Sequence, residues 1–200
     1  MISFNQFIKL KEALSFDDPL AQSILKIKDK SSGIITFEFN LDNDYYQIDI
    51  FNVPEIIYIE NTKISTLNLM EITLKLNGTY KLTNKMGMQA NTVYNMLLNA
   101  IKQAHEHFGE NNVHGYQFLG AQSQQNIMYD RLMKRFSPNL ITWSYMIYLK
   151  PESVQKLKDE NPHMIEEINE KIDQSTLEKE ISLQQAKENK NLERSLRRQP

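Results

Sequence analysis

The chain has 200 residues, of which 40% are hydrophobic and 24% are charged, and its formal net charge is −2. These values are typical of a globular protein with one sizeable core, and so small a net charge excludes a strong attraction to nucleic acid or an anionic membrane. The sequence has no cysteine, which excludes disulfides, thiol catalysis and thiolate metal sites. No apolar run approaches the roughly 20 residues that span a bilayer, and we expect no signal peptide.

The N-terminal segment, residues 1–30, carries apolar side chains at helical spacing. Asp18 and Pro19 are typical of an N-cap and a first helical residue, so we expect a second short helix that buries Ile27. The sequence therefore predicts that residues 1–32 form helices packed on the main domain.

The next segment alternates apolar and polar residues, which is the period of half-buried strands. Pro54 is expected to end the second of these strands. Asn77-Gly78 predicts a hairpin, because both residue types tolerate a positive φ. The predicted strands are residues 35–41, 46–50, 56–59, 67–76 and 79–83.

The period then changes to that of helices alternating with strands. A continuous apolar stripe predicts a helix from Asn91 to Phe108, and Gly109 ends it as a C′ residue. The later predicted elements are a strand at residues 113–119, a helix at 123–136 and one long strand at 140–149.

Residues 151–200 contain neither aromatic residues nor glycine, and they predict a helical appendage with a break at Asn161-Pro162. Its apolar stripe is too thin to form an independent core, so the appendage needs the domain or a partner. The segment ends with three arginines. They are interpreted either as a solvated face that suits a helix C-terminus or as a contact with a subunit or nucleic acid. These residues are Arg194, Arg197 and Arg198.

The order of hairpin strand, long helix, strand, helix and strand from Met70 to Leu149 resembles the C-terminal half of the GNAT acetyltransferase fold. The resemblance implies an α+β protein with a mixed, mostly antiparallel sheet and flanking helices. We assign residues 33–150 to this GNAT-like domain and residues 151–200 to a C-terminal helical tail.

In that family, backbone amides of the turn before the long helix hold the pyrophosphate of acyl-CoA, as helix N-termini hold anions generally. Gly87 matches the first glycine of the family's turn, whereas Asn84 and Gln89 replace its leading Arg or Gln and its second small residue. The alternative interpretation of Gly87 is a loop glycine with a positive φ. The resemblance implies cofactor binding by Lys85, Met86, Gly87, Met88 and Gln89.

Tyr129 lies at the position where many GNAT enzymes carry a tyrosine that protonates the departing CoA thiolate. The resemblance therefore implies that Tyr129 is the catalytic acid. The alternative is that Tyr129 is a half-buried packing residue between helix and sheet.

A closer resemblance is to small GNAT-like proteins of tailed bacteriophages. It rests on Gly78–Thr83, with the sequence GTYKLT, and on Met128–Arg135, with the sequence MYDRLMKR. Two polar positions of the phage pattern are altered here, to Met88-Gln89-Ala90 and to Gln125, which favours a degenerate ligand site.

We therefore predict a phage structural or assembly protein built on a non-catalytic GNAT-like scaffold, which docks to other virion subunits through its helical tail. The alternatives are an acetyl-CoA-dependent N-acetyltransferase and a host-directed binding or inhibitor protein. We expect no metal site and no cofactor, or acetyl-CoA if the enzyme alternative holds. The expected partners are other phage structural proteins or a second copy, with nucleic acid only through the Arg-rich C-terminus and no membrane. The expected location is the virion or the host cytoplasm.

Overall fold

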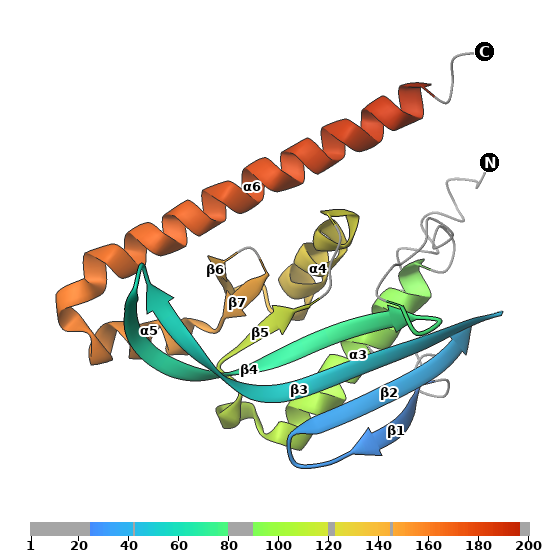
Figure 1. Ribbon diagram of the computed structural model, residues 1–200, viewed down its shortest axis with the longest axis horizontal. Helices are drawn as coiled ribbons and strands as arrows, with labels where there is room; N and C mark the ends of the chain where they lie inside the picture. The colour runs from blue at the N-terminus through green and yellow to red at the C-terminus, as the bar shows by residue number, and fades with distance from the viewer. Residues whose placement is uncertain (1–24, 42, 80–89, 120–122, 145, 197–200) are drawn as a thin grey trace. The chain divides into compact units, whose positions relative to one another are not determined.

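The structure is a computed structural model that describes residues 25–41, 43–79, 90–119, 123–144 and 146–196 (Figure 1). The predicted helices within residues 1–24 and most of the predicted strand at 79–83 lie outside these described residues. In chain order the elements are β1 (Lys26–Lys30), β2 (Ile34–Leu41), β3 (Asp44–Ile59), β4 (Thr62–Leu76), α3 (Ala90–Phe108), η2 (Glu110–Asn112), β5 (Gly115–Phe118), α4 (Ser123–Phe136), β6 (Ile141–Ser144), β7 (Ile147–Leu149), α5 (Pro151–Glu160), η3 (Pro162–Met164) and α6 (Ile165–Leu196).

The described strands form a seven-stranded sheet in the order β1-β2-β3-β4-β5-β7-β6. Its β1–β2, β2–β3, β5–β7 and β6–β7 pairs are antiparallel, and β4–β5 is parallel. The predicted α+β class with a mostly antiparallel sheet is therefore confirmed. So are the two helices between the strands, since α3 and α4 lie where the apolar periodicity placed them.

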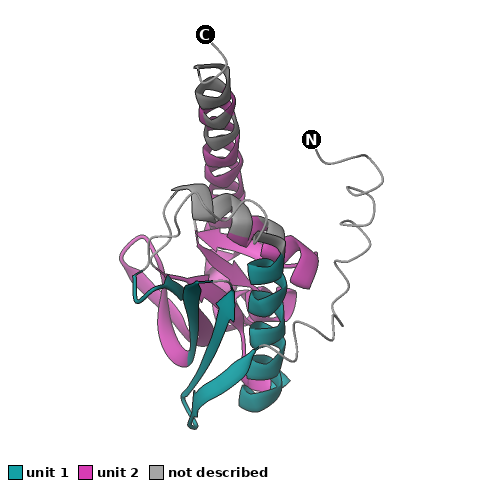
Figure 2. Cartoon of the chain, turned by 90° about the vertical axis from the view of Figure 1, so that its right-hand side faces the viewer, with its two compact units in different colours: residues 1–51, 73–110 teal, residues 52–72, 111–200 magenta. Residues whose placement is uncertain are grey.

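The chain divides into two compact units (Figure 2). Unit 1 comprises residues 1–51 and 73–110, and unit 2 comprises residues 52–72 and 111–200. The long strands β3 and β4 contribute residues to both units.

The core of unit 1 combines alternate residues of its strands with one face of α3. Level partners on β2 and β3, such as Phe37 with Ile48 and Phe39 with Tyr46, are almost completely buried. The rings of Phe39 and Tyr46 stack with their centroids 4.9 Å apart. The buried residues of α3 recur at helical spacing, at Val93, Met96, Leu97, Ala100, Ile101 and Ala104.

The prediction that the N-terminal helices extend to residue 30 is wrong for its last part. Lys26–Lys30 form strand β1, which pairs antiparallel with β2, and Ile27 is 49% exposed. The ladder offered by β2 outweighs the local helical spacing of this charged segment, because tertiary pairing overrides weak propensity.

The prediction that Pro54 ends a strand is also wrong, because β3 continues through it to Ile59. Proline lacks the N–H that a strand donates, so it is tolerated where that side has no neighbour. The pairing of β2 with β3 ends at Phe51, three residues before Pro54.

The Asn77-Gly78 turn is confirmed. Both residues have a positive φ, 49° and 77°, as a two-residue hairpin turn requires. Leu76 and Thr79 exchange backbone hydrogen bonds of 2.8 and 2.9 Å across it. Gly109 likewise ends α3 with a φ of 85°, and its N–H donates to the His105 carbonyl.

The centre of unit 2 is the parallel pair of β4 and β5, in which Leu69 is level with Gly115 and Ile72 with Phe118. Gly115 has no room for a side chain. An added Cβ would lie 2.5 Å from the Tyr148 carbonyl oxygen and 2.9 Å from a Leu149 methyl carbon. The glycine thus permits close packing where β5 meets β7.

One long strand was predicted at residues 140–149, and this is wrong. Residues 141–144 and 147–149 form two strands, β6 and β7, which pair antiparallel with Thr142 level with Tyr148. The reversal lacks glycine, asparagine or proline, so its sequence carries none of the usual turn signals.

The appendage predicted after Pro151 begins with α5 and, after the expected break at Asn161-Pro162, continues as α6. Ile57, Leu67, Trp143, Leu157 and Ile168 belong to one buried cluster of unit 2. The thin apolar stripe is thus covered by β3, β4 and β6. Side chains reinforce this packing, since Ser65 donates to Glu160 (2.8 Å) and the Asn161 amide donates to the Ile64 carbonyl (3.1 Å).

We expect Gly115→Ala to lower the free energy of unfolding by about 1–3 kcal/mol, because the new methyl group meets backbone at 2.5 Å and cannot be accommodated without movement. Urea unfolding measures the change. Gly33→Ala is the matched control, since a Cβ there meets nothing within 4 Å. Equal stability of the two variants would contradict the close packing of β5.

Candidate functional site

All five residues predicted to bind a cofactor precede α3 in the segment between residues 79 and 90. Lys85, Met86, Gly87, Met88 and Gln89 lie outside the described residues. The same is true of Arg197 and Arg198, whereas Arg194 belongs to the last turns of α6. Tyr129, on α4, is the predicted site residue whose burial and ring contacts the structure describes.

Tyr129 lies in an aromatic cluster of unit 2. Its side chain is 1% exposed, and its ring stacks on Phe118 with centroids 4.2 Å apart and planes 19° apart. Phe118 in turn meets Tyr148 edge to face at 6.2 Å. Burial raises the pKa of the Tyr129 hydroxyl far above its ordinary value. These contacts agree with a packing role, because a general acid works best with a pKa near the operating pH and in reach of its substrate.

A second group of polar side chains lies on the parallel strands of unit 2. Glu71 of β4 is level with Gln117 of β5. Burial, and next the charge of Glu55, raise the pKa of the Glu71 carboxyl above its ordinary value. The Oε1 atom of Gln117 is buried and lacks a hydrogen-bond partner among the described residues. A carboxylate with a raised pKa can accept a proton from a bound ligand. An amide oxygen beside it can accept a hydrogen bond from the same ligand and so hold the ligand in position.

Neither Glu71 nor Gln117 was identified from the sequence. A signal was present for Glu71, because it is the single carboxylate within Leu67–Leu76, a run that is otherwise largely apolar. Isolated ionisable groups in buried strands often mark functional sites. Gln117 carried no comparable signal, since its unpaired oxygen depends on its neighbours in the folded sheet.

In unit 1 the Asp49 carboxylate has a structural role, because several side chains donate hydrogen bonds to it. Asp49 accepts hydrogen bonds from Thr36 (2.9 Å), Gln47 (2.8 Å) and Lys75 (2.8 Å). Burial alone would raise the pKa of Asp49, but these donors and the Lys75 charge lower it below its ordinary value. The carboxylate therefore crosslinks β2, β3 and β4 in its ionised form.

The attachment of α6 to unit 2 depends on a buried ion pair. Lys179 Nζ lies 2.7 Å from Asp130 Oδ1 of α4, and the two side chains are 8% and 6% exposed. The same ammonium lies 3.8 Å from the centre of the Tyr148 ring. Burial lowers the pKa of Lys179, while Asp130 opposes that shift. One turn earlier, the Ser175 hydroxyl donates to the Trp143 carbonyl at 2.8 Å.

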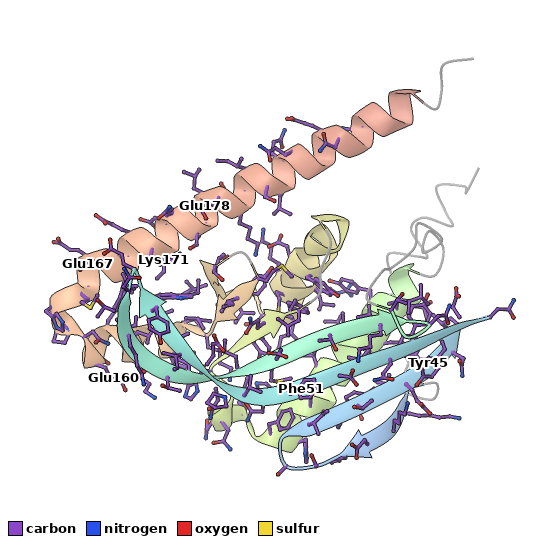
Figure 3. All side chains as sticks on the ribbon, viewed as in Figure 1. Tyr45, Phe51, Glu160, Glu167, Lys171 and Glu178 are labelled. Atoms are coloured by element: carbon purple, nitrogen blue, oxygen red, sulfur yellow. The ribbon has the colours of Figure 1, made fainter. Side chains whose placement is uncertain are left out.

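The opposite face of α6 is exposed. Leu177 and Ile181, four residues apart, have exposed fractions of 58% and 48%. Figure 3 marks the course of the helix by Glu167, Lys171 and Glu178. In Figure 1, α6 continues beyond α4 and β6. Its described side chains from Gln184 to Asn191 are exposed. One face of α6 thus anchors the helix, while Leu177 and Ile181 on the other face are exposed.

No known protein family, curated protein or solved structure matches this chain. Within the described segments, histidines, aspartates and glutamates do not gather in groups of three that suit a metal ion. None of the described helices is long and apolar enough to cross a membrane.

We expect Glu71→Gln to raise stability at neutral pH. Folding raises the pKa of the Glu71 carboxyl, so the folded protein favours the protonated form. The protonated carboxyl stabilises the fold fully below the unfolded pKa of about 4.3. This stabilisation is lost as the pH rises through the folded pKa, because the buried group then ionises. The advantage of the variant should therefore shrink as pH falls toward 4. Melting temperatures from about pH 3.5 to 7.5 test this, with the exposed Glu167→Gln as control. A pH-independent difference would contradict it.

We expect Asp130→Ala to lower the free energy of unfolding by about 3–5 kcal/mol, because it leaves the buried Lys179 ammonium without its counter-ion. Lys134→Ala is the matched control. Lys134 also pairs with Asp130, at 3.1 Å, but its side chain is 70% exposed, so its loss should cost less than about 1 kcal/mol. Urea unfolding compares the two variants, and equal losses would show that the buried pair does not anchor α6.

Proposed function

We propose that this chain is an assembly protein that binds other protein subunits through α6 and carries a GNAT-like scaffold that does not catalyse acetyl transfer. The observation that supports this best is the two-sided character of α6. Ile168, Ser175 and Lys179 fix one face to unit 2, while Leu177 and Ile181 are exposed on the other. Exposed aliphatic residues on a helix that extends past its neighbours are typical of a binding surface.

The GNAT-like part of the proposal is supported by the order of elements. A strand, a crossover helix and a parallel strand, namely β4, α3 and β5, are followed by α4 and by β7 on the far side of β5. The resemblance implies a helix, a strand, a helix and one strand after the hairpin, and α3, β5 and α4 follow that order, with the pair β6 and β7 in place of the last strand. The burial of Tyr129 against Phe118 supports the non-catalytic part, because the tyrosine is used for packing.

The likeness of Gly78–Thr83 and Met128–Arg135 to phage sequences suggests where such a protein would act. We propose a tailed-phage particle, with the host cytoplasm as the place of assembly. The partners would be other virion subunits or a second copy of the chain.

The second candidate function is an acetyl-CoA-dependent N-acetyltransferase, and Glu71 favours it. Burial raises the pKa of the Glu71 carboxylate, which is level with Gln117 on the parallel pair. Such a carboxylate has the properties of a general base that accepts a proton from an attacking amine. The carboxyl ends of parallel strands are also where ligands bind in open sheets. In this alternative acetyl-CoA is the cofactor.

Titration with acetyl-CoA separates the two candidates. We expect no thermal shift, whereas a specific ligand at 100 times its Kd would add about 2.7 kcal/mol of stability.

We also expect Tyr129→Phe to keep the stability of the parent, because the phenylalanine ring retains the stack on Phe118. A saturable shift, with acetyl transfer reduced by Tyr129→Phe or Glu71→Gln, would establish the enzyme and overturn the assembly proposal. Absence of the chain from purified particles, judged by mass spectrometry, would overturn the virion placement alone.

A further inference from the structure

We propose that His114 is an acid-sensitive latch, which holds the start of α5 to β4 while its ring is neutral and weakens that attachment when its ring is protonated. His114 directly precedes β5 in unit 2, and α5 leads through η3 into α6. The latch goes beyond the proposed function, because it would act on this part of unit 2 whatever α6 binds.

The first observation is a pair of hydrogen bonds between His114 and Asn68 of β4. The His114 N–H donates to the Asn68 carbonyl at 2.8 Å, and the Asn68 N–H donates to Nδ1 of the His114 ring at 3.0 Å. These bonds continue the parallel pairing of β4 and β5 by one position beyond Leu69 and Gly115. Because a backbone N–H can only donate, Nδ1 must carry a lone pair, and the proton of the neutral ring is on Nε2.

The second observation is that the backbone of the same residue holds the start of α5. The His114 carbonyl accepts hydrogen bonds from the Lys150 N–H at 3.0 Å and from the Ser153 hydroxyl at 2.8 Å. Ser153 lies in the first turn of α5 and is 1% exposed. His114 therefore contacts β4 through its ring and α5 through its carbonyl, so a displacement of this residue affects both attachments.

A protonated ring is incompatible with this arrangement. An imidazolium carries a hydrogen on both nitrogens, so its Nδ1–H would face the Asn68 N–H, donor against donor. The ring would have to turn away, and the Asn68 N–H would lose its acceptor at a half-buried position, which costs stability. Protonation thus removes one of the two bonds that hold His114 against β4.

The charges around the ring act in the same direction. Burial, and next Lys156 and Lys150, lower the pKa of His114, while Glu152 and Glu160 oppose this shift. Lys150 directly precedes α5 and Lys156 lies within it. A positive charge on His114 would therefore meet a net repulsion from the segment that its own carbonyl holds.

The lowered pKa determines the pH range in which the latch acts. A histidine whose pKa is lowered on folding stabilises the fold fully above its unfolded pKa of about 6.5. This stabilisation is lost as the pH falls from there through the folded pKa, because the folded protein must then take up a proton that it disfavours. The latch should therefore weaken in mildly acidic solution.

Hydrogen exchange of the full chain, followed by mass spectrometry, tests the latch at about pH 7.5 and pH 5.0, with rates corrected for the intrinsic effect of pH. We expect the amides of residues 66–70 and 150–157 to lose protection at the lower pH, since these segments bond to His114. The amides of β2, in unit 1, serve as the internal reference and should keep their protection.

His114→Asn separates the histidine from other titrating groups. The asparagine oxygen can still accept a hydrogen bond from the Asn68 N–H, but the side chain does not titrate. We expect this variant to retain protection of residues 150–157 at both pH values. His163→Asn is the matched control, because His163 is exposed on η3, and it should lose protection as the parent does. Glu71 is common to all three proteins, so its titration does not affect the comparison.

Equal protection of residues 150–157 at the two pH values in the parent would overturn the latch. So would a His114→Asn variant that loses protection as much as the parent does. If His114→Asn does not fold, titration of the His114 ring by NMR in the parent decides, and a pKa at or above 6.5 would overturn the proposal. All of these outcomes leave the proposed function standing, because none of them concerns what α6 binds.

Discussion

The parallel pairing of β4 with β5 is the constraint on which the rest of unit 2 depends. Parallel neighbours cannot be joined by a tight turn, so the chain must leave the sheet and return through a crossover, here by way of α3. Once β5 is in place, Gly115 lets β7 approach it, and Phe118 supplies the surface on which Tyr129 stacks. The same pairing sets Glu71 beside Gln117, so scaffold and candidate chemistry share one origin.

Long periodic segments and glycine signals were enough to predict α3, α4, β2 and the Asn77-Gly78 turn, because in each the local preference and the final packing agree. The errors occurred where a distant partner decides the outcome. Lys26–Lys30 are a strand because β2 offers a ladder, and β3 passes Pro54 because its pairing with β2 has already ended. The reversal between β6 and β7 has no glycine, asparagine or proline, and β7 pairs with both β5 and β6.

The candidate site was predictable in part for a similar reason. Tyr129 could be found by resemblance, but only the fold shows that its ring is buried against Phe118. Glu71 was visible as a lone carboxylate in an apolar run, yet its raised pKa depends on burial and on Glu55, which is sixteen residues away in sequence. The anchoring of α6 could not be predicted, because nothing in the sequence distinguishes Lys179 from the other lysines of this polar helix. Only the fold brings it against Asp130 and Tyr148.

The burial of Lys179 fixes the rotation of α6 about its axis, and the two candidate functions differ in whether they need that rotation to be fixed. Removing an ammonium from water is costly, and a hydrophobic residue at this position would often be no less stabilising. What an ion pair adds is specificity, because only one rotation of α6 about its axis brings Lys179 onto Asp130 and Ser175 onto the Trp143 carbonyl. That rotation directs Leu177 and Ile181 away from unit 2. An enzyme working at Glu71 has no use for a fixed rotation of α6, whereas a protein that binds through the outer face of this helix depends on it.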